Sequence, residues 1–162
     1  MELITLRELF KNIDKYAGQE ITVGGWVRNK RPSKQFGFIV LNDGSYFTPV
    51  QVVYNDTLAN FQEISKINIS AALIVRGTVE LTPDAKQPFE IQASSITVEG
   101  PSTGDYPLQP KKHSMEYLRT ITHLRPRANT FQAVFRIRSL AAMAIHQFFQ
   151  DRDFVYVHTP LI

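Results

Sequence analysis

The sequence predicts an all-β fold, a five-stranded barrel with one helix before the first strand and another between the third and fourth strands. Three observations support this fold class. Five short extended segments follow one another between residues 20 and 99, turn-forming residues separate them, and helical periodicity falls where the two helices are expected. With 43% hydrophobic and 20% charged residues, the 162-residue chain can form one such core and an appendage.

The first helix is delimited by its own residues. Thr5 and Glu8 have the spacing of a capping box, in which each side chain satisfies a backbone N–H of the other residue. Gly18 is placed to end the helix, because glycine readily adopts the left-handed conformation found at helix ends. We therefore expect one helix between Thr5 and Gly18. Apolar residues recur along it at helical spacing: Leu6, Leu9, Phe10 and Ile13.

The first strand is "EITVGGWVRN", residues 20–29. Its branched apolar residues alternate with other residues, as they do in a strand with one buried face. The pair Gly24 and Gly25 lies inside this strand. Such glycines indicate a bulge or a sharp bend, which small barrels need when they close.

The other strands are short and are separated by turn signals. The second, "FGFIVL", ends at "NDG", a typical hairpin sequence; the third, fourth and fifth are "PVQVVY", "ALIVRGTVEL" and "FEIQASSITVE". Between the third and fourth, "NDTLANFQEISKI" predicts a short helix capped by Asn55 or Asp56. Leu58, Phe61 and Ile64 would face inward. This order of elements is that of the OB-fold barrel, which commonly binds oligonucleotides on the face of strands two and three.

A basic segment leads directly into two aromatic residues. The stretch "VRNKRPSKQFGFIV" carries Arg28, Lys30 and Arg31 ahead of Phe36 and Phe38. If the apolar residues that alternate with Phe38 point into the barrel, both rings point outward, beside the cations. An outward ring can stack on a base, at about 1–3 kcal/mol, and cations neutralise phosphates. From their charge, we expect Arg28 and Lys30 to contact phosphates.

Gln51 is a polar residue in the middle of the third strand, between Val50 and Val52. Its side-chain amide has both donors and an acceptor, which suits it to read the edge of a base. The net charge of +3 decides little, because many proteins that never bind nucleic acid are equally basic. On the residues alone an alternative stays open, in which the two rings are ordinary core or barrel-surface residues.

The sequence changes character after Glu99. The segment "GPSTGDYPLQP" carries three prolines and two glycines, which indicates a hinge. From Asn129 the pattern is that of a long amphipathic helix, and "DFVYVHTPLI" then predicts a strand. We expect a barrel domain at residues 1–100, a hinge at 101–128 and the start of a second domain at 129–162. Part of that second domain would be missing, because the helix has no partner to cover its apolar face.

Several classes of site are disfavoured by composition. The chain has no cysteine, which excludes a disulfide scaffold, a thiolate zinc site and a cysteine nucleophile. Its four histidines lack the spacing of a metal site, and no catalytic triad can be argued. The first residues do not have the pattern of a secretion signal, and no apolar run is long enough to span a bilayer. We therefore expect a cytoplasmic protein with no membrane partner, no metal site and no catalytic residue in this chain.

Longer motifs carry a resemblance to a known family. The segments "GGWVRNKR", "FGFIVLNDGS" and "VQVVY" resemble the barrel strands of class II aminoacyl-tRNA synthetases, in the subgroup for aspartate, asparagine and lysine. The segment "FRIRSLAAMAIHQFFQDRDFVYVHTPLI" resembles motif one of that class, a long helix and a strand that ends at Pro160. Within the subgroup, "EYLRTITHLRPRANTFQAVFRIRS" is similar to the bacterial asparaginyl branch, whereas aspartyl enzymes usually have an "RYRYLDLR"-like segment there.

The resemblance implies roles for four barrel residues. Phe38 corresponds to the ring that stacks on an anticodon base, and Gln51 to the residue that reads the central uridine. Arg31 corresponds to a basic residue that contacts the anticodon loop. Glu90 matches an acidic position near the first anticodon base, although related families use that position for different bases.

The resemblance also implies properties of a longer parent enzyme. That enzyme would use ATP and Mg²⁺ to activate asparagine and transfer it to tRNA(Asn), as a homodimer formed through motif one. Motifs two and three, which hold ATP, are not found up to Ile162, so we expect this chain alone to be inactive and to bind no cofactor. The alternatives are a non-discriminating aspartyl enzyme and a non-catalytic OB-fold protein that binds tRNA or single strands. Motif-one residues expected at or near the dimer interface, or else in ordinary packing, are Val134, Ile137, Ala141 and Pro160.

Overall fold

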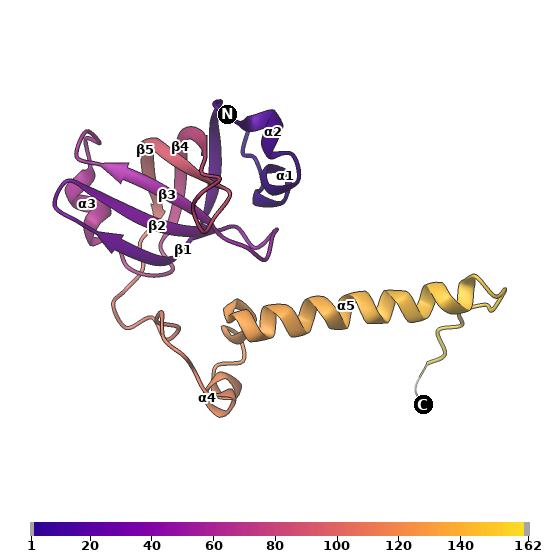
Figure 1. The fold of residues 1–162 in the computed structure, drawn as a ribbon. Coiled ribbons are helices and arrows are strands. Elements are labelled where there is room, and N and C mark those ends of the chain that lie inside the picture. Colours follow the sequence, from indigo (N-terminus) through magenta and orange to yellow (C-terminus); the bar gives the residue numbers. More distant parts are fainter. Residues whose placement is uncertain (1, 161–162) are drawn as a thin grey trace. The chain divides into compact units, whose positions relative to one another are not determined.

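The computed structural model describes residues 2–160, which divide into two compact units. The first extends to Lys111 and the second begins at Lys112. The first unit contains the barrel and the second contains the long helix (Figure 1). The three-part division expected from the sequence, with boundaries after residues 100 and 128, stays a prediction.

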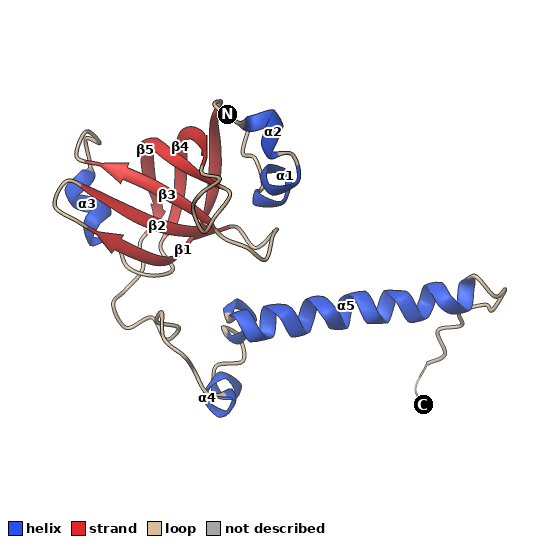
Figure 2. Ribbon diagram, in the orientation of Figure 1, coloured by secondary structure: helices blue, strands red, loops and turns tan. Residues whose placement is uncertain are grey.

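The first unit is a closed barrel of five strands, in the order β1-β2-β3-β5-β4 (Figure 2). Neighbouring strands are antiparallel except β3 and β5, which are parallel. The predicted OB-fold barrel, with a helix before β1 and another between β3 and β4, is confirmed. The elements are α1 (Leu6–Lys11), α2 (Ile13–Tyr16), β1 (Glu20–Pro32), β2 (Phe36–Asn42), β3 (Val50–Asn55), α3 (Phe61–Lys66), β4 (Ala72–Leu81) and β5 (Phe89–Gly100).

Helix α3 packs on the barrel core through Phe61 and Ile64, and Leu58 just before it is also buried, as predicted. The helix begins later than predicted, because Asn55 does not cap it. Instead, Asn55 Oδ1 accepts a hydrogen bond from the backbone N–H of Thr57, which closes a local turn before the helix.

The N-terminal helix is shorter than predicted. Thr5 caps α1 by accepting a hydrogen bond from the backbone N–H of Glu8 at 3.2 Å. The single helix predicted as far as Gly18 is wrong, because the chain leaves helical geometry at Asn12 and α2 starts after it. The Asn12 side chain donates to the carbonyl of Glu8, a local bond that competes with helix continuation.

Of the bulge or sharp bend expected at the two glycines of β1, the bulge does not form there. The pairing of β1 with β4 continues through both of them, and the register shifts instead between Val27 and Asn29, opposite β2. Gly25 has a different role: a Cβ atom there would lie 2.9 Å from the carbonyl oxygen of Asn42. The missing side chain therefore lets β1 approach the end of β2 closely.

The second unit consists of α4 (Met115–Thr120), the 3₁₀ helix η1 (Arg125–Arg127) and α5 (Asn129–Gln150). The start of α5 confirms the helix predicted from Asn129. The strand predicted after it does not form in the described residues, which have no regular structure at 154–160; its last two residues lie outside them. A strand needs a neighbouring strand for its backbone hydrogen bonds. Among the helices described, none is both long and apolar enough to cross a membrane.

Candidate nucleic-acid interface

The bulge in β1 decides which basic residue faces outward. Before it, Val27 pairs with Leu41, whose side chain is buried; after it, Arg31 pairs with Phe38. Residues paired across antiparallel strands lie on the same face of the sheet. The extra residue, Arg28, shifts the alternation by one position. Arg31 therefore lies on the outer face with Phe38, although simple alternation from Val27 would place it inside.

The two phenylalanine rings of β2 lie together on the outer face, as predicted. Their centroids are 5.5 Å apart in an edge-to-face arrangement; Phe36 is 45% exposed and Phe38 is half-buried. Between them, Gly37 faces inward against the buried ring of Tyr54. A Cβ atom at position 37 would overlap that ring. Glycine there keeps β2, and with it both outer rings, close to the barrel core.

A row of polar side chains extends from the two phenylalanine rings over the outer face of the barrel. The Arg31 guanidinium lies 5.5 Å from the centre of the Phe38 ring, and its Nη2 reaches Gln51 Oε1 at 3.4 Å. The other end of the same amide, Gln51 Nε2, donates to Glu90 Oε1 at 2.7 Å. The parallel pairing of β3 with β5 sets Gln51 opposite Glu90. Phe38, Arg31, Gln51 and Glu90 thus form one contiguous group from four strands, which we call the Phe38 face.

Gln87 contacts the Phe38 face, although the sequence did not identify it. Its Nε2 donates to Glu90 Oε1 at 2.6 Å, so that one carboxylate oxygen accepts two amide hydrogen bonds. Gln87 lies in the turn between β4 and β5. Turn residues have no periodicity that would show where their side chains point, and its only sequence signal is a polar side chain three residues before Glu90.

The structure does not bring Lys30 to the Phe38 face. Lys30 pairs with the buried Ile39, on the opposite face from Arg31, and its Nζ donates to the carbonyl of Ser65 at 3.2 Å. Burial lowers the pKa of the Lys30 amine. Arg28 is half-buried within the bulge itself. Their expected roles as phosphate contacts stay predictions.

The motif-one residues lie in the second unit, where the apolar face of α5 is uncovered. Val134 is 47% exposed and Ile137 is 67% exposed, and Ala141 and Pro160 are exposed as well. Their role at a dimer interface stays a prediction. Among residues 2–160, no group of three or more acidic or histidine side chains could hold a metal ion.

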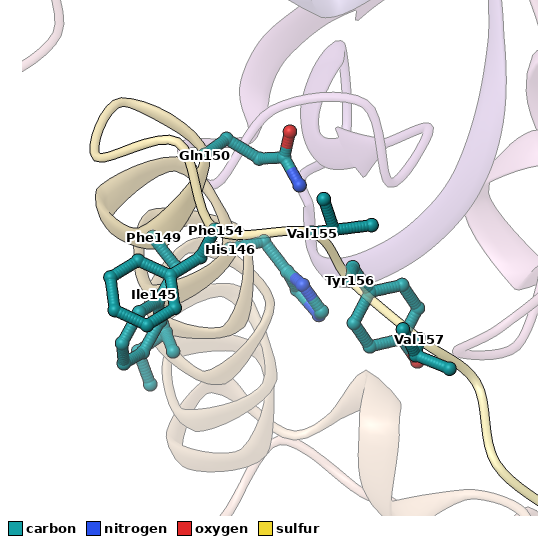
Figure 3. A pocket seen from close by; sticks show the side chains of 8 residues that line it. All are labelled: Ile145, His146, Phe149, Gln150, Phe154, Val155, Tyr156 and Val157. Carbon is teal, nitrogen blue, oxygen red and sulfur yellow. The ribbon is translucent and has the colours of Figure 1, made fainter.

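A hollow of about 270 Å³ lies where the chain turns back along the end of α5 (Figure 3). The rings of His146 and Tyr156 meet there edge to face, with centroids 4.8 Å apart. The lining carries no acidic or basic group other than this histidine, so we assign no chemistry to the hollow. Its lining residues are Ile145, His146, Phe149, Gln150, Phe154, Val155, Tyr156 and Val157.

Comparison with known proteins agrees with an OB-fold barrel that binds nucleic acid. A family model described as an OB-fold nucleic acid binding domain matches residues 21–99. Proteins curated as asparagine–tRNA ligases from Alkaliphilus oremlandii and Bacillus cereus are 62% and 59% identical to the chain over all of its 162 residues. The chain spans 35% of the length of each of these relatives.

A solved structure has the same fold. It is a crystal structure of asparaginyl-tRNA synthetase from Pyrococcus horikoshii complexed with asparaginyl-adenylate, and it matches with a TM-score of 0.85. The match covers 99% of this chain and 37% of that one, at 20% identity, and so bears on the fold alone. This structure confirms the predicted fold class, and the curated relatives confirm the resemblance to the asparaginyl branch.

Proposed function

We propose, on the premise that the chain belongs to the family of the asparagine–tRNA ligases, that its barrel binds the anticodon loop of tRNA(Asn) on the Phe38 face. One observation carries the proposal. Four strands contribute an aromatic ring, a cation, an amide and a carboxylate, and each of these groups contacts the next in that order. OB-folds bind nucleic acids on this face of the barrel.

Each group supplies a different interaction with an unpaired loop. The half-buried Phe38 ring would stack on one base, while Arg31 beside it neutralises a phosphate. The amide of Gln51 would read the edge of the central uridine. The Glu90 carboxylate accepts hydrogen bonds and would lie near the first anticodon base.

We also propose that the parent enzyme is an asparagine–tRNA ligase. It would activate asparagine with ATP and Mg²⁺, release pyrophosphate and transfer the asparaginyl group to the terminal ribose of the tRNA. Motifs two and three are not found among residues 1–162, so we assign neither ATP nor Mg²⁺ to these residues and expect no aminoacylation by them alone. The parent would act in the cytoplasm as a homodimer, with Val134, Ile137, Ala141 and Pro160 at or near the interface.

Replacement of one ring tests the proposed anticodon interface. Phe38→Ala removes the stacking surface, so we expect the anticodon stem-loop of tRNA(Asn) to bind residues 1–162 more weakly by about 1–3 kcal/mol. The measurement is the Kd of a fluorescently labelled stem-loop at fixed salt concentration. Phe47→Ala is the matched control, because Phe47 is 46% exposed and lies in the loop beyond the far end of β2.

Two results would contradict the proposal. One is an unchanged Kd for Phe38→Ala. The other is equal binding of the tRNA(Asn) loop and scrambled loops by the unaltered chain, which would indicate a general single-strand binder. A protein that binds the tRNA(Asp) loop as tightly as the tRNA(Asn) loop would instead be a non-discriminating member of the subgroup.

A further inference from the structure

We infer that Gln87 is a positioning residue, which acts through Glu90 to fix the amide of Gln51 in the orientation that distinguishes uracil from cytosine. The inference rests on the proposed function, because it concerns how the Phe38 face reads one base. It adds a residue from the β4–β5 turn, outside the four strands that form that face.

Both ends of the Gln51 amide are held. The oxygen accepts a contact from Arg31 Nη2 at 3.4 Å, and the nitrogen donates to Glu90 Oε1 at 2.7 Å. Rotation of the amide by half a turn would set its NH₂ group against the Arg31 donor and its oxygen against the Glu90 carboxylate. Both new pairs repel, because donors face each other at one end and acceptors at the other. The two neighbours therefore select a single orientation.

Glu90 can select this orientation only if its own carboxylate stays beside β3. On the opposite side, β4 sets Glu80 directly across from Glu90, and residues so paired share a face of the sheet. Two carboxylates in that position repel each other. Gln87 counters this by donating to the same oxygen that Gln51 uses, at 2.6 Å, in a hydrogen bond strengthened by the negative charge.

The turn that carries Gln87 is itself anchored. Thr82 Oγ1 donates to the backbone carbonyl of Gln87 at 2.8 Å, and the Thr82 N–H donates to the carbonyl of Pro88 at 2.9 Å. Gln87 and Glu90 are both half-buried. The position of the Gln87 amide is therefore set by the turn, and this amide can in turn set the position of Glu90.

A fixed amide discriminates between pyrimidines. With one N–H given to Glu90 and one oxygen lone pair to Arg31, Gln51 retains one N–H and one lone pair in a fixed spatial order. Uracil presents an acceptor at position 4 and a donor at N3, whereas cytosine presents a donor and then an acceptor. A fixed order of donor and acceptor on Gln51 therefore pairs with positions 4 and 3 of only one of the two bases. The proposed function requires that base to be uracil. An amide free to rotate would match either.

The test uses anticodon stem-loops that differ only in a central uridine or cytidine. For each variant of residues 1–162, the ratio of the two Kd values is measured at fixed salt concentration. Gln87→Leu removes the donor, and we expect it to lower the preference for uridine by about three- to tenfold, as for one lost hydrogen bond. Gln87→Lys restores a donor to Glu90, and the preference should return. Gln19→Leu makes the same change at an exposed site in the first unit, before β1, and should leave the ratio unchanged.

The outcomes separate the inference from the proposed function. If the unaltered chain prefers the uridine loop and Gln87→Leu prefers it equally, the inference is wrong and the proposed function stands. If Gln87→Lys loses the preference together with Gln87→Leu, donation to Glu90 is not the cause, and the inference is again wrong. If the unaltered chain binds all loops alike, the proposed function fails and the inference fails with it.

Discussion

Glu20, at the start of β1, connects three strands through one carboxylate. Ser94 Oγ on β5 donates to its Oε1 at 2.9 Å, and Arg76 on β4 forms an ion pair with its Oε2. Both bonds lower the pKa of Glu20. The hydrogen bond from Ser94 is the larger cause, and the one from Arg76 is the next. A carboxyl whose pKa is lower in the folded state stabilises the fold above its unfolded pKa. That stability is lost as the pH falls through the folded value.

The sign of this effect gives a pH-dependent prediction. Glu20→Gln should lower the melting temperature at pH 7, and the difference from the unaltered chain should shrink as the pH falls below the ordinary glutamate pKa of about 4.3 and on through the lower pKa of the folded state. Thermal unfolding across this range measures it. Ser94→Ala removes the larger cause and should follow the same trend with a smaller amplitude. A difference that stays constant with pH would show that the carboxylate charge has no part in it.

Single side chains were predictable from the sequence where strand alternation alone determined them. The outward direction of Phe38 follows from its alternation with the buried Ile39. Lys30 and Arg31 could not be assigned to their faces in this way, because the bulge at Arg28 depends on how β1 pairs with β2. Pairing with another strand leaves no mark in the local sequence.

Strands and helices were predicted well where the local sequence pattern determines them. They were predicted poorly where their formation depends on contacts with residues distant in the sequence. The segments predicted for β4 and β5 match the observed strands to within a residue, since period-two alternation runs through β4 and marks both ends of β5, on either side of a change of phase between Ala93 and Ile96. The predicted strand after α5 does not form at residues 154–160, because nothing in the described chain pairs with it. The N-terminal helix breaks at Asn12, whose side chain bonds the carbonyl of Glu8, a contact that the periodicity of the helix does not reveal.

Gly77 shows what the pairing of β4 with β5 requires. The register of the two strands shifts between Arg76 and Gly77, where the backbones come close together. A Cβ atom at position 77 would lie 2.8 Å from the carbonyl carbon of Gln92 and 2.9 Å from the Cα of Ala93. These are backbone atoms of the adjoining strand, so they cannot move aside as a flexible side chain could.

We therefore expect Gly77→Ala to destabilise the barrel by about 1–3 kcal/mol, the usual cost of overpacking. Urea unfolding followed by tryptophan fluorescence measures the change in free energy of unfolding, because Trp26 lies in β1. Gly104→Ala is the control: a Cβ atom at position 104 would have no neighbouring atom within 4 Å, and a surface change of this kind stays within about 0.5 kcal/mol. Equal stability of the two variants would contradict this view of the β4–β5 contact.

The first unit of the chain has its own hydrophobic core, whereas the described part of the second unit has few buried apolar residues. The buried apolar cluster lies entirely between Leu6 and Ile96, within the first unit. Among the described residues of the second unit, only Leu118 and Phe131 are buried hydrophobics. Every residue of the Phe38 face, and Gln87 as well, belongs to the first unit. Its stability and its binding should therefore be separable from the second unit.

This separation predicts the behaviour of residues 1–111 alone. The shortened protein should unfold cooperatively and bind the tRNA(Asn) anticodon stem-loop with a binding free energy within about 0.5 kcal/mol of that of residues 1–162, because it retains every residue of the Phe38 face. Calorimetry and titration of the labelled stem-loop measure the two properties. Full-length tRNA provides a further comparison, since basic residues such as Lys112 and Arg119 lie in the second unit and could contact its stem. Loss of stem-loop binding on truncation, with the barrel still folded, would mean that the second unit forms part of the interface.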